Sequence, residues 1–454
     1  MHRQAPDSSP SAGKPEGRRI AVVGAGIAGL ASAWLLSSRH DVTLYEASDY
    51  LGGQARTVDA SLDGISHPID TGFLAFNQPD HPNFTALLDH LGVESTGTGM
   101  SISFSLGQPG LEWAGSSPAT VFGQKRKLLR PRFWRVLADL SRFNRQSVAW
   151  LAAHPHDNLS LRDFLQAGGY SDAFAAWCLM PMGAAVWPCA SGQVLDYPLA
   201  SFVRFCRNHG LMQAFGRPAW RAVAGGGREC VRKLAAGVGR IRLACPVRHV
   251  HRAAFGALVE TADDCRRYDD VVLACHSEQA LALLGRGATG DERRLLQAIR
   301  YEASRAVLHT DTSLLPRNPA LWSTWNYRAA SDGPGDARYG MSCLINHLQP
   351  LPCETPAIVS MAPARAPAPG SVIAEFDYAH PLFDGAAVAA QRELAGRVGH
   401  DGIWLCGAWN GHGFHEDSLK SALRLANAMG CHAPWQPAAA AEVIGRGAPL
   451  PHAA

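Results

Sequence analysis

The chain has 454 residues, of which 47% are hydrophobic and 18% charged, so it is long enough for two or three globular domains with a large core. Its formal net charge of +3 is too small to indicate nucleic-acid binding. The 11 cysteines form no Cys-x-x-Cys pair, so the sequence supports neither a disulfide framework nor a zinc site, and we expect reduced thiols in a cytoplasmic protein.

The first predicted feature is a leader followed by a strand and a tight turn. Residues 1–17 are rich in Ser, Pro and Gly and are expected to be a disordered leader. An apolar β-branched run, 19–23, then ends in a Gly-x-Gly-x-x-Gly turn, and an uncharged helical segment, 30–38, follows. The stretch 20–38 also resembles a signal peptide or a membrane span, but three glycines at turn spacing weaken a spanning helix. We therefore interpret this stretch as strand, turn and helix.

The turn has the spacing that a dinucleotide requires. Gly24 permits the sharp bend, Gly26 lets a pyrophosphate approach the backbone, and Gly29 lets the helix lie close on its strand. The helix N-terminus, with Ile27 and Ala28, presents unpaired N–H groups to the phosphates. The next strand, 41–45, delivers Glu46 about 20 residues further on, where a carboxylate can accept hydrogen bonds from an adenosine ribose. Together these residues predict dinucleotide binding.

The rest of the chain alternates between segments with helical and strand patterns. The predicted helices are 83–91, which ends at Gly92, several within 116–220, then 229–236 and 418–429. The predicted strands are 69–73, 100–113, 241–250, 258–261, 269–275 and 402–407, with further sheet and loops over 300–378. The run 269–275 is uncharged and β-branched, which is typical of a central parallel strand.

Sequence of the dinucleotide-binding kind therefore occurs at the beginning, in the middle and near the end of the chain. We predict an α/β fold in which a Rossmann-like domain is interrupted by a mixed α+β substrate domain, with the ligand in the crevice between them. The expected parts of the Rossmann-like domain are 18–80, 222–285 and 395–432. The substrate domain is expected to comprise 81–221 and 286–394, and 433–454 is expected to be a loose tail.

A second glycine pair, Gly52 and Gly53, follows Glu46, and Arg56 and Thr57 stand close behind. Here the sequence resembles the flavin-containing amine oxidase and phytoene desaturase superfamily, over residues 18–432. The resemblance implies a GR2-type FAD-binding domain, in which the glycine pair and the following Arg continue along the FAD diphosphate. It also implies that Val247 contacts adenine through its backbone. A nicotinamide dehydrogenase has no use for this glycine pair.

The C-terminal segment resembles the second FAD signature of the same superfamily. In that signature a glycine at the end of a strand, here Gly407, precedes a loop and a helix aimed at the isoalloxazine ring. Asp417 or Ser418 is expected to cap this helix, so that the N–H groups of its first turn, with Leu419, face the N1–C2=O edge of the flavin. An ordinary strand-to-helix turn over 407–418 is the alternative.

More narrowly, the chain resembles the predicted FAD-binding proteins found beside, or fused to, cyclopropane fatty acid synthases. The phrases that carry this resemblance are 70–77, 181–187, 205–210 and 413–417. The resemblance implies an FAD-dependent oxidoreductase, of oxidase or desaturase type, that takes a hydride from an activated C–H bond of an acyl lipid or modified fatty acid. The alternatives are oxidation of an amine or a carotenoid-like polyene, and a non-catalytic flavoprotein partner of a lipid methyltransferase.

Histidines near the C-terminus are the candidates for a general base. His412, His415 and Glu416 lie in a glycine-rich segment whose order does not match metalloprotease patterns, so no metal is expected. His415 and His209 are the candidate bases, because a flavin accepts the hydride itself and the protein supplies at most one base. Lysines are scarce, and Lys420 alone is near the expected flavin, which counts against amine chemistry.

A basic amphipathic segment, 125–145, carries eight Lys and Arg side chains against a single acid, Asp139, with aromatic and Leu residues between them. One hypothesis is that it rests on an anionic membrane surface at the inner face and admits a phospholipid chain. The alternative is the solvated face of a helix packed on the core. Stacking on single-stranded nucleic acid is disfavoured by the nearly neutral charge of the whole chain.

Overall fold

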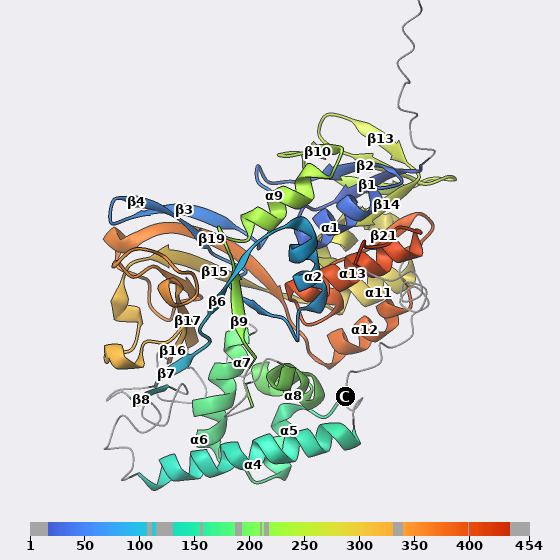
Figure 1. Ribbon diagram of the computed structural model, residues 1–454. Helices are drawn as coiled ribbons and strands as arrows, with labels where there is room; N and C mark the ends of the chain where they lie inside the picture. The colour runs from blue at the N-terminus through green and yellow to red at the C-terminus, as the bar shows by residue number, and fades with distance from the viewer. Residues whose placement is uncertain are drawn as a thin grey trace, which may run out of the picture.

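The structure is a computed structural model that describes residues 17–435 except 107–110, 115–129, 155–157, 187–192, 209–210, 213–217, 330–338 and 398. Most of the predicted leader, and the predicted tail from 436 onward, lie outside the described residues. Figure 1 shows two sheet-containing regions side by side, with a group of helices packed below them. The arrangement confirms the α/β class expected from the sequence.

The first region is built on a six-stranded sheet whose strands come from distant parts of the chain. In spatial order these are β10 (Arg240–Arg242), β2 (Asp41–Tyr45), β1 (Arg19–Val23), β14 (Asp270–Leu273), β21 (Ile403–Leu405) and β20 (Gly399–His400). All neighbours are parallel except β20, which is antiparallel to β21. Every residue of β14 is buried, which explains why its sequence is an uncharged β-branched run.

Helices cover both faces of this sheet, as the alternation of β1 shows. Ile20 and Val22 pack into one hydrophobic cluster and Ala21 and Val23 into another, because successive side chains of a strand point to opposite faces. The first face carries α1 (Ile27–Leu36), α2 (Pro82–Leu91), α9 (Arg228–Ala236) and α13 (His415–Ala428). The second carries α10 (Ser277–Leu284), α11 (Gly290–Gln297), α12 (Gly385–Ala395) and the antiparallel strands β11 (His249–Arg252), β12 (Ala257–Glu260) and β13 (Cys265–Tyr268).

The second region is a seven-stranded sheet. In spatial order its strands are β19 (Val372–Pro381), β15 (Tyr301–His309), β18 (Ile358–Met361), β17 (Tyr339–Leu344), β16 (Trp325–Ala329), β7 (Ile102–Leu106) and β8 (Leu111–Ala114). The hairpin β3 (Thr57–Leu62) and β4 (Ile65–Asp70) packs on this sheet through Ala60, Leu62 and Ile69. Segment 57–70 thus shares its core with the second sheet, although it follows the glycine motifs in sequence.

A small sheet and a helical group complete the described structure. The small sheet comprises β5 (Phe76–Asn77), β9 (Trp220–Val223) and β6 (Ser95–Thr98). The helices are α4 (Pro131–Ala153), α5 (Leu161–Ala167), α6 (Asp172–Phe174), α7 (Met180–Val186) and α8 (Leu199–Asn208), around an aromatic core that includes Phe143, Phe174 and Phe202. None of the helices in the described part of the chain is long and apolar enough to cross a membrane.

Several boundaries differ from the sequence prediction. The first helix begins at Ile27 rather than Leu30, and the last begins at His415 rather than Ser418. The predicted strand 241–250 is two short strands, β10 and β11, with Val247 in the connection between them. At the start of the predicted tail, the Trp435 ring stacks on the Trp34 ring at a centroid separation of 6.2 Å.

Candidate functional site

A trough of about 1800 Å³ lies at the carboxyl ends of the parallel strands, which is where ligands bind in open α/β sheets. The turns after β1, β2, β14 and β21 form one wall, and residues 377–381 of β19 form the other. The predicted FAD-binding residues that line the trough are Gly24, Gly26, Ile27, Ala28, Glu46, Gly52, Gly53, Val247, Gly407 and Ser418. The structure therefore brings segments from across the whole chain to one surface.

The glycine turn after β1 leaves backbone groups open to this trough. Gly24 has φ +101, and a Cβ there would lie 2.8 Å from the Ala274 carbonyl oxygen. A Cβ on Gly26 would meet no atom within 4 Å, so this position faces open space in the trough. Helix α1 begins beside it with no side-chain cap, which leaves its first N–H groups available to an anion.

Gly29 and the second glycine pair have packing roles in the same turn. A Cβ on Gly29 would lie 1.8 Å from the Gly24 carbonyl oxygen, so only glycine lets α1 approach this closely. The Gly52 N–H donates to the Ala25 carbonyl over 2.8 Å, and a Cβ on Gly53 would lie 3.2 Å from the Gly26 Cα. The two glycine motifs thus contact each other directly and form one continuous backbone surface.

Glu46 ends its strand at the edge of the trough with its carboxylate held in place. One oxygen, Oε2, accepts a hydrogen bond from the Ala25 N–H over 2.7 Å, and Oε1 accepts one from the Ser48 N–H over 2.9 Å. Each carboxylate oxygen has a second acceptor position, so Glu46 can still accept from hydroxyl groups of a ribose. The predicted contact between Glu46 and a ribose remains a prediction.

Other predicted binding residues do not line either cavity described in this section. The Arg56 guanidinium lies over the rings of Tyr50 and Phe376, at 4.1 and 4.6 Å from their centroids. The Thr57 hydroxyl donates to Asp70 over 2.6 Å and accepts from the Arg228 N–H over 3.0 Å.

Leu419 is fully buried in the core. Arg56, Thr57 and Leu419 therefore make their contacts outside the two cavities.

The start of α13 differs from the predicted cap. Asp417 is the third helical residue, and its Oδ2 accepts from the His412 and Phe414 N–H groups over 3.0 and 3.1 Å, which ties the preceding loop to the helix. Asp417 does not line the trough, whereas Ser418 and His415 do. Asp417 therefore caps the helix from its third position, by accepting the N–H of the N-cap residue Phe414, because the helix already starts at His415 rather than at Ser418.

Glu416 faces away from the trough. Its Oε1 accepts from Asn83 Nδ2 over 2.7 Å and its Oε2 from the Phe84 N–H over 3.0 Å, so it holds the N-terminus of α2. The Lys420 ammonium lies 3.7 Å from Glu416 Oε1. Among the residues that the structure describes, no three His, Cys, Asp or Glu side chains are grouped as a metal site would require.

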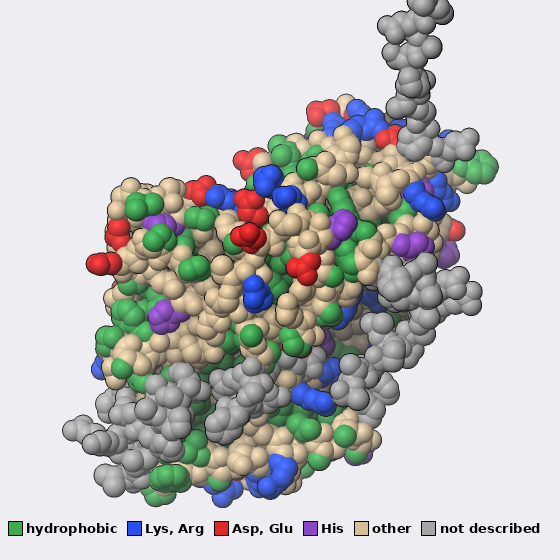
Figure 2. Space-filling view, viewed as in Figure 1, with side chains coloured by type: hydrophobic (Ala, Val, Ile, Leu, Met, Phe, Trp, Pro, Cys, Tyr) green, Lys and Arg blue, Asp and Glu red, His purple; other side chains and the backbone are tan. Residues whose placement is uncertain are grey.

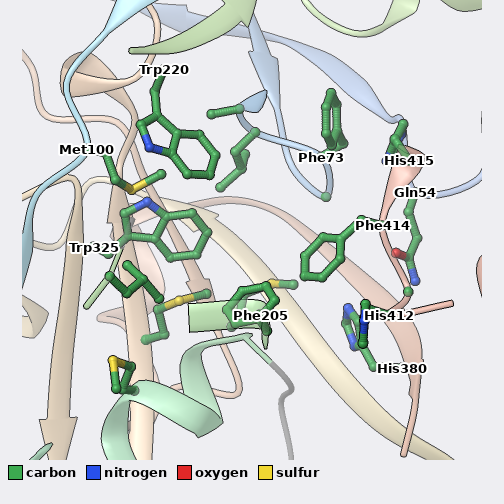
Figure 3. Close-up of a pocket in the computed structure, with 18 of the residues that line it drawn as sticks. Gln54, Phe73, Met100, Phe205, Trp220, Trp325, His380, His412, Phe414 and His415 are labelled. Carbon is green, nitrogen blue, oxygen red and sulfur yellow. The ribbon is translucent and has the colours of Figure 1, made fainter. Parts of the chain in front are cut away.

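A second cavity, the apolar chamber, opens beside the trough with a volume of about 1250 Å³. Its wall consists mainly of aromatic side chains and methionines, from β16, β17, β18, α8 and the loop before α13 (Figure 3). Five residues line both cavities and define the junction between them, namely Gln54, His380, Pro381, Gly413 and His415. Among the described residues of the chamber wall there is no Asp, Glu, Lys or Arg.

The histidines of the chamber wall are neutral at physiological pH. Burial lowers the pKa of His81 and of His380 to about 4 each, and that of His415 to about 3. Burial also lowers the pKa of His412, against the opposite influence of Asp417. The His415 ring stacks on Phe73 at a centroid distance of 3.7 Å, which fixes its orientation. The other candidate base, His209, lies outside the described residues.

Sequence reasoning missed most of the chamber, including His380, Met100, Trp325, Met341 and Met361. Met341 and Met361 are directly paired across β17 and β18, so their proximity can be inferred only when the strand register is known. His380 is the second-last residue of the long strand β19. A polar residue at the end of a strand was the one sequence feature that could have indicated its place in the site.

The open position at Gly26, the uncapped start of α1 and two buried unpaired nitrogens, His380 Nδ1 and His415 Nε2, fit an extended flavin dinucleotide whose ring reaches the junction. Comparison with known proteins agrees with this fit. The sequence pattern of the family described as flavin containing amine oxidoreductase matches residues 27–345. A stretch of 78 residues is 41% identical to protoporphyrinogen oxidase 2, chloroplastic/mitochondrial, from Arabidopsis thaliana, covering 17% of this chain and 14% of that protein.

Solved structures with the same fold include cyclohexylamine oxidase from Brevibacterium oxydans, with a TM-score of 0.64, 17% identity, and coverage of 95% of this chain and 100% of that one. The CLA-producing fatty acid isomerase from P. acnes gives a TM-score of 0.63 at 17% identity, covering 90% of this chain and 97% of that one. Because the family pattern spans most of the chain, together with this fold and trough, the chain belongs to the flavin containing amine oxidoreductase family and is an FAD-dependent oxidoreductase.

Proposed function

We propose that this oxidoreductase takes a hydride from an activated C–H bond of an acyl lipid or modified fatty acid, as an oxidase or desaturase does. The observation that supports this substrate class is the apolar chamber, whose described wall contains no charged side chain and whose histidines are neutral. A buried ammonium group needs a nearby carboxylate to offset its lost hydration, and the described wall offers none. An amine substrate is therefore disfavoured.

The residues proposed to hold FAD follow the trough from one end to the other. Val247 lies where the adenine is expected, Glu46 where the ribose is expected, and the N–H groups around Gly26 where the diphosphate is expected. Gly407 and the first turn of α13 are proposed to face the N1–C2=O edge of the flavin ring. When bound, FAD supplies the hydride acceptor. The protein then has to place the substrate carbon at the junction and exclude water from it.

His415 is proposed to contact the substrate or the flavin ring at the junction. A neutral imidazole can accept a proton, but burial that lowers the pKa of His415 to about 3 makes it a weak base. We therefore assign hydrogen bonding, rather than lasting proton storage, to His415. The Phe73 ring beneath it and the apolar wall around it keep the junction dry.

Two further proposals concern partners. A lipid methyltransferase is proposed to supply or share the modified acyl chain. The second is peripheral membrane contact through 125–145, of which 125–129 lie outside the described residues. Figure 2 shows Lys and Arg side chains along the lower edge of the molecule, over α4. However, the Arg142 guanidinium bonds to the buried Asp139 over 3.1 Å, and Arg135 contacts the same carboxylate.

Arg130 and Arg145 are therefore the better positions to test membrane contact, since substitution of Arg135 or Arg142 disturbs the fold. Co-sedimentation with vesicles of anionic phospholipid is expected to fall in an Arg130→Gln, Arg145→Gln double variant. Vesicles of zwitterionic phospholipid serve as the control. Equal binding to both vesicle types by the unmodified protein would count against the membrane proposal.

The substrate proposal is tested by anaerobic mixing of the FAD-loaded protein with phospholipid acyl chains, free fatty acids, a carotenoid and a long-chain amine. An oxidase or desaturase bleaches its flavin absorbance with its own substrate class. Bleaching by the amine alone would overturn the acyl-lipid proposal, and bleaching by the carotenoid alone would replace it with the polyene alternative. Tight binding of acyl chains without any bleaching would identify a lipid-binding flavoprotein instead.

A further inference from the structure

Methionines are concentrated in the wall of the apolar chamber. The chain has eight methionines, and four of them belong to the 24 described residues that line this cavity, namely Met100, Met182, Met341 and Met361. They come from a loop, a helix and two strands, so no single stretch of sequence explains the concentration. The chamber therefore presents thioether groups to its occupant, among aromatic rings.

Methionine forms a wall whose shape is not fixed. Its side chain is unbranched, turns about three bonds and carries a polarisable sulfur, so it fills irregular gaps and re-packs around different partners. Leu and Ile are equally apolar but have better-defined rotamers, so they hold one shape more firmly. Proteins that bind several ligands of different shape use flexible Met-rich surfaces for this reason. A substrate cavity rich in methionine therefore indicates that more than one chain shape is accepted.

Two of the four methionines are held in place by the seven-stranded sheet. Met341 and Met361 are paired directly across β17 and β18, and both are buried. The Tyr327 hydroxyl also donates a hydrogen bond to Met341 Sδ over 3.0 Å, and the Tyr327 ring stacks on Phe104 at a centroid distance of 5.5 Å. The sheet side of the chamber is therefore a fixed surface.

The other two methionines are less constrained. Met100 lies in the connection between β6 and β7, Met182 lies on α7, and both are half-buried. The backbone beside Met182 is tightly packed, because a Cβ on Gly183 would lie 2.2 Å from Val194 Cγ1, so any adjustment there falls to the Met182 side chain. Figure 3 shows Met100 at the end of the chamber opposite His380. The adjustable contacts of the chamber therefore come from Met100 and Met182.

We propose that Met100 and Met182 let the chamber accept acyl chains of several shapes by changing their side-chain conformations around each chain. The shapes are straight, cis-unsaturated, methyl-branched and cyclopropane-bearing. This inference rests on the proposed function, because it takes the occupant of the chamber to be an acyl chain. Met100 and Met182 are then specificity-determining residues, whereas Met341 and Met361 keep the sheet side of the chamber in one shape.

The test compares the binding of chains that differ in shape. The FAD-loaded protein is photoreduced under argon, so that it cannot oxidise the probes. It is then titrated with octadecane and with four methyl esters, of stearic acid, oleic acid, a mid-chain methyl-branched acid and a mid-chain cyclopropane acid, delivered from cyclodextrin. Binding is followed by the fluorescence of the chamber tryptophans, Trp220 and Trp325. We expect the dissociation constants of the four esters to agree within about threefold, because the methionines re-pack around each chain.

The variants replace flexible thioethers by a stiffer side chain of similar volume. The double variant Met100→Leu, Met182→Leu is expected to bind octadecane and methyl stearate as the unmodified protein does. It should bind the oleate, branched and cyclopropane esters roughly five- to thirtyfold more weakly, because these chains overfill a wall that cannot re-pack. The matched control is Met180→Leu, which makes the same change on α7 at a buried residue outside both cavities and should keep all the affinities.

A second measurement reports the side-chain conformations in the unmodified protein. Isotopically labelled methionine methyl groups give separate NMR signals whose positions depend on the terminal torsion, and single Leu variants assign them. The Met100 and Met182 signals are expected to differ between the stearate and cyclopropane complexes. The signals of Met180 and Met429, which line neither cavity, should be the same in both complexes.

Each contrary outcome has a separate meaning. A strong preference of the unmodified protein for one chain shape would overturn this inference and leave the acyl-lipid proposal intact. Absence of binding by every probe would overturn both. If the double variant keeps the full range, or loses straight and bent chains equally, the two methionines supply contact rather than adaptability and the inference is wrong. Identical Met100 and Met182 signals in every complex would refute it even where the double variant does not fold.

Discussion

The trough and the apolar chamber are built from different parts of the polypeptide. The trough contains short glycine-rich turns whose residues are close in sequence, such as 24–28 and 52–54, although later segments such as 377–381 complete it. The chamber is lined by side chains from strands and helices that are far apart in sequence. Much of cofactor binding can therefore be encoded in short sequence motifs, whereas substrate selection depends on how the whole fold is assembled.

Filling the trough should abolish cofactor binding without disturbing the chamber. In Gly26→Leu the new side chain enters open space that the structure leaves around this position, so the protein is expected to fold and to exclude the diphosphate. We expect purified Gly26→Leu to be colourless and to resist reconstitution with FAD, as measured by visible absorbance per protein. Gly97→Leu, also with open space around its Cβ, is the control. Retention of yellow colour by Gly26→Leu would contradict the proposed diphosphate site.

The contact between the end of β4 and the start of α9 should make the stability of the protein depend on pH, through Asp70. This carboxyl group ends β4 and accepts the Gly227 N–H at the start of α9 over 2.9 Å. Burial raises the pKa of Asp70 to about 6, so the folded protein holds the proton more tightly than the unfolded chain. The stability contributed by this group is therefore lost as the pH rises from about 4 to about 6.

In Asp70→Asn this loss is absent. Relative to the unmodified protein, the variant should gain about 3 kcal/mol in free energy of unfolding between about pH 4 and about pH 7. Urea unfolding of both proteins at each pH, at equal FAD concentration, measures the difference. A difference that does not change with pH would show that Asp70 stays ionised in the folded protein.

Removing the Glu46 charge from the trough should weaken FAD binding without affecting the binding of acyl chains. Glu46→Gln keeps a single side-chain oxygen where the carboxylate now accepts from two backbone N–H groups. Because hydrogen bonds to a charged group contribute about 1.5–3 kcal/mol, FAD affinity is expected to fall roughly ten- to a hundredfold. Titration of the FAD-free protein with FAD measures it. Glu229→Gln on α9, outside both cavities, should bind FAD normally.

Adding a charge to the chamber should weaken the binding of apolar chains and leave FAD binding unchanged. Met100 lies at the end of the chamber far from the junction (Figure 3), so Met100→Lys is expected to weaken octadecane binding by about fivefold through the cost of placing a cation against apolar wall. FAD retention should stay unchanged. Ile65→Lys, at the exposed start of β4, changes the net charge equally and is the control. Parallel loss of FAD in Met100→Lys would show that the two cavities are not independent.

The parts of the fold that were predictable from sequence are those with local signals. Strand β2 occupies 41–45 as predicted, and α2 ends at Gly92, whose φ of 62 is the left-handed conformation that favours glycine. The start of α13 was placed three residues too late, because an acid within the helix, Asp417, reaches back to bond the preceding loop. A sequence pattern cannot distinguish an acid at the N-cap from an acid in the third helical position that bonds back to the preceding loop.

The side-chain environment of the site was much less predictable. Arg56 follows the second glycine pair as expected, yet its guanidinium lies over Phe376 from β19, a contact that no spacing in the motif reveals. The chamber depends on pairings such as Met341 with Met361, and these require knowledge of strand register. Long-range packing therefore accounts for most of what the sequence left open.

The strand order of the six-stranded sheet also constrains how the protein is made. β1 lies beside β14, and β14 lies beside β21, which is synthesised about 380 residues after β1. The last strand partner of β1 is β14, about 250 residues later in the chain, so at ribosomal speeds of about 5–20 residues per second β1 is without it for roughly 12–50 seconds. During this interval its apolar faces and open edge are exposed to other chains. Co-translational chaperone binding to the newly made N-terminal segment is therefore expected to govern the yield of active enzyme.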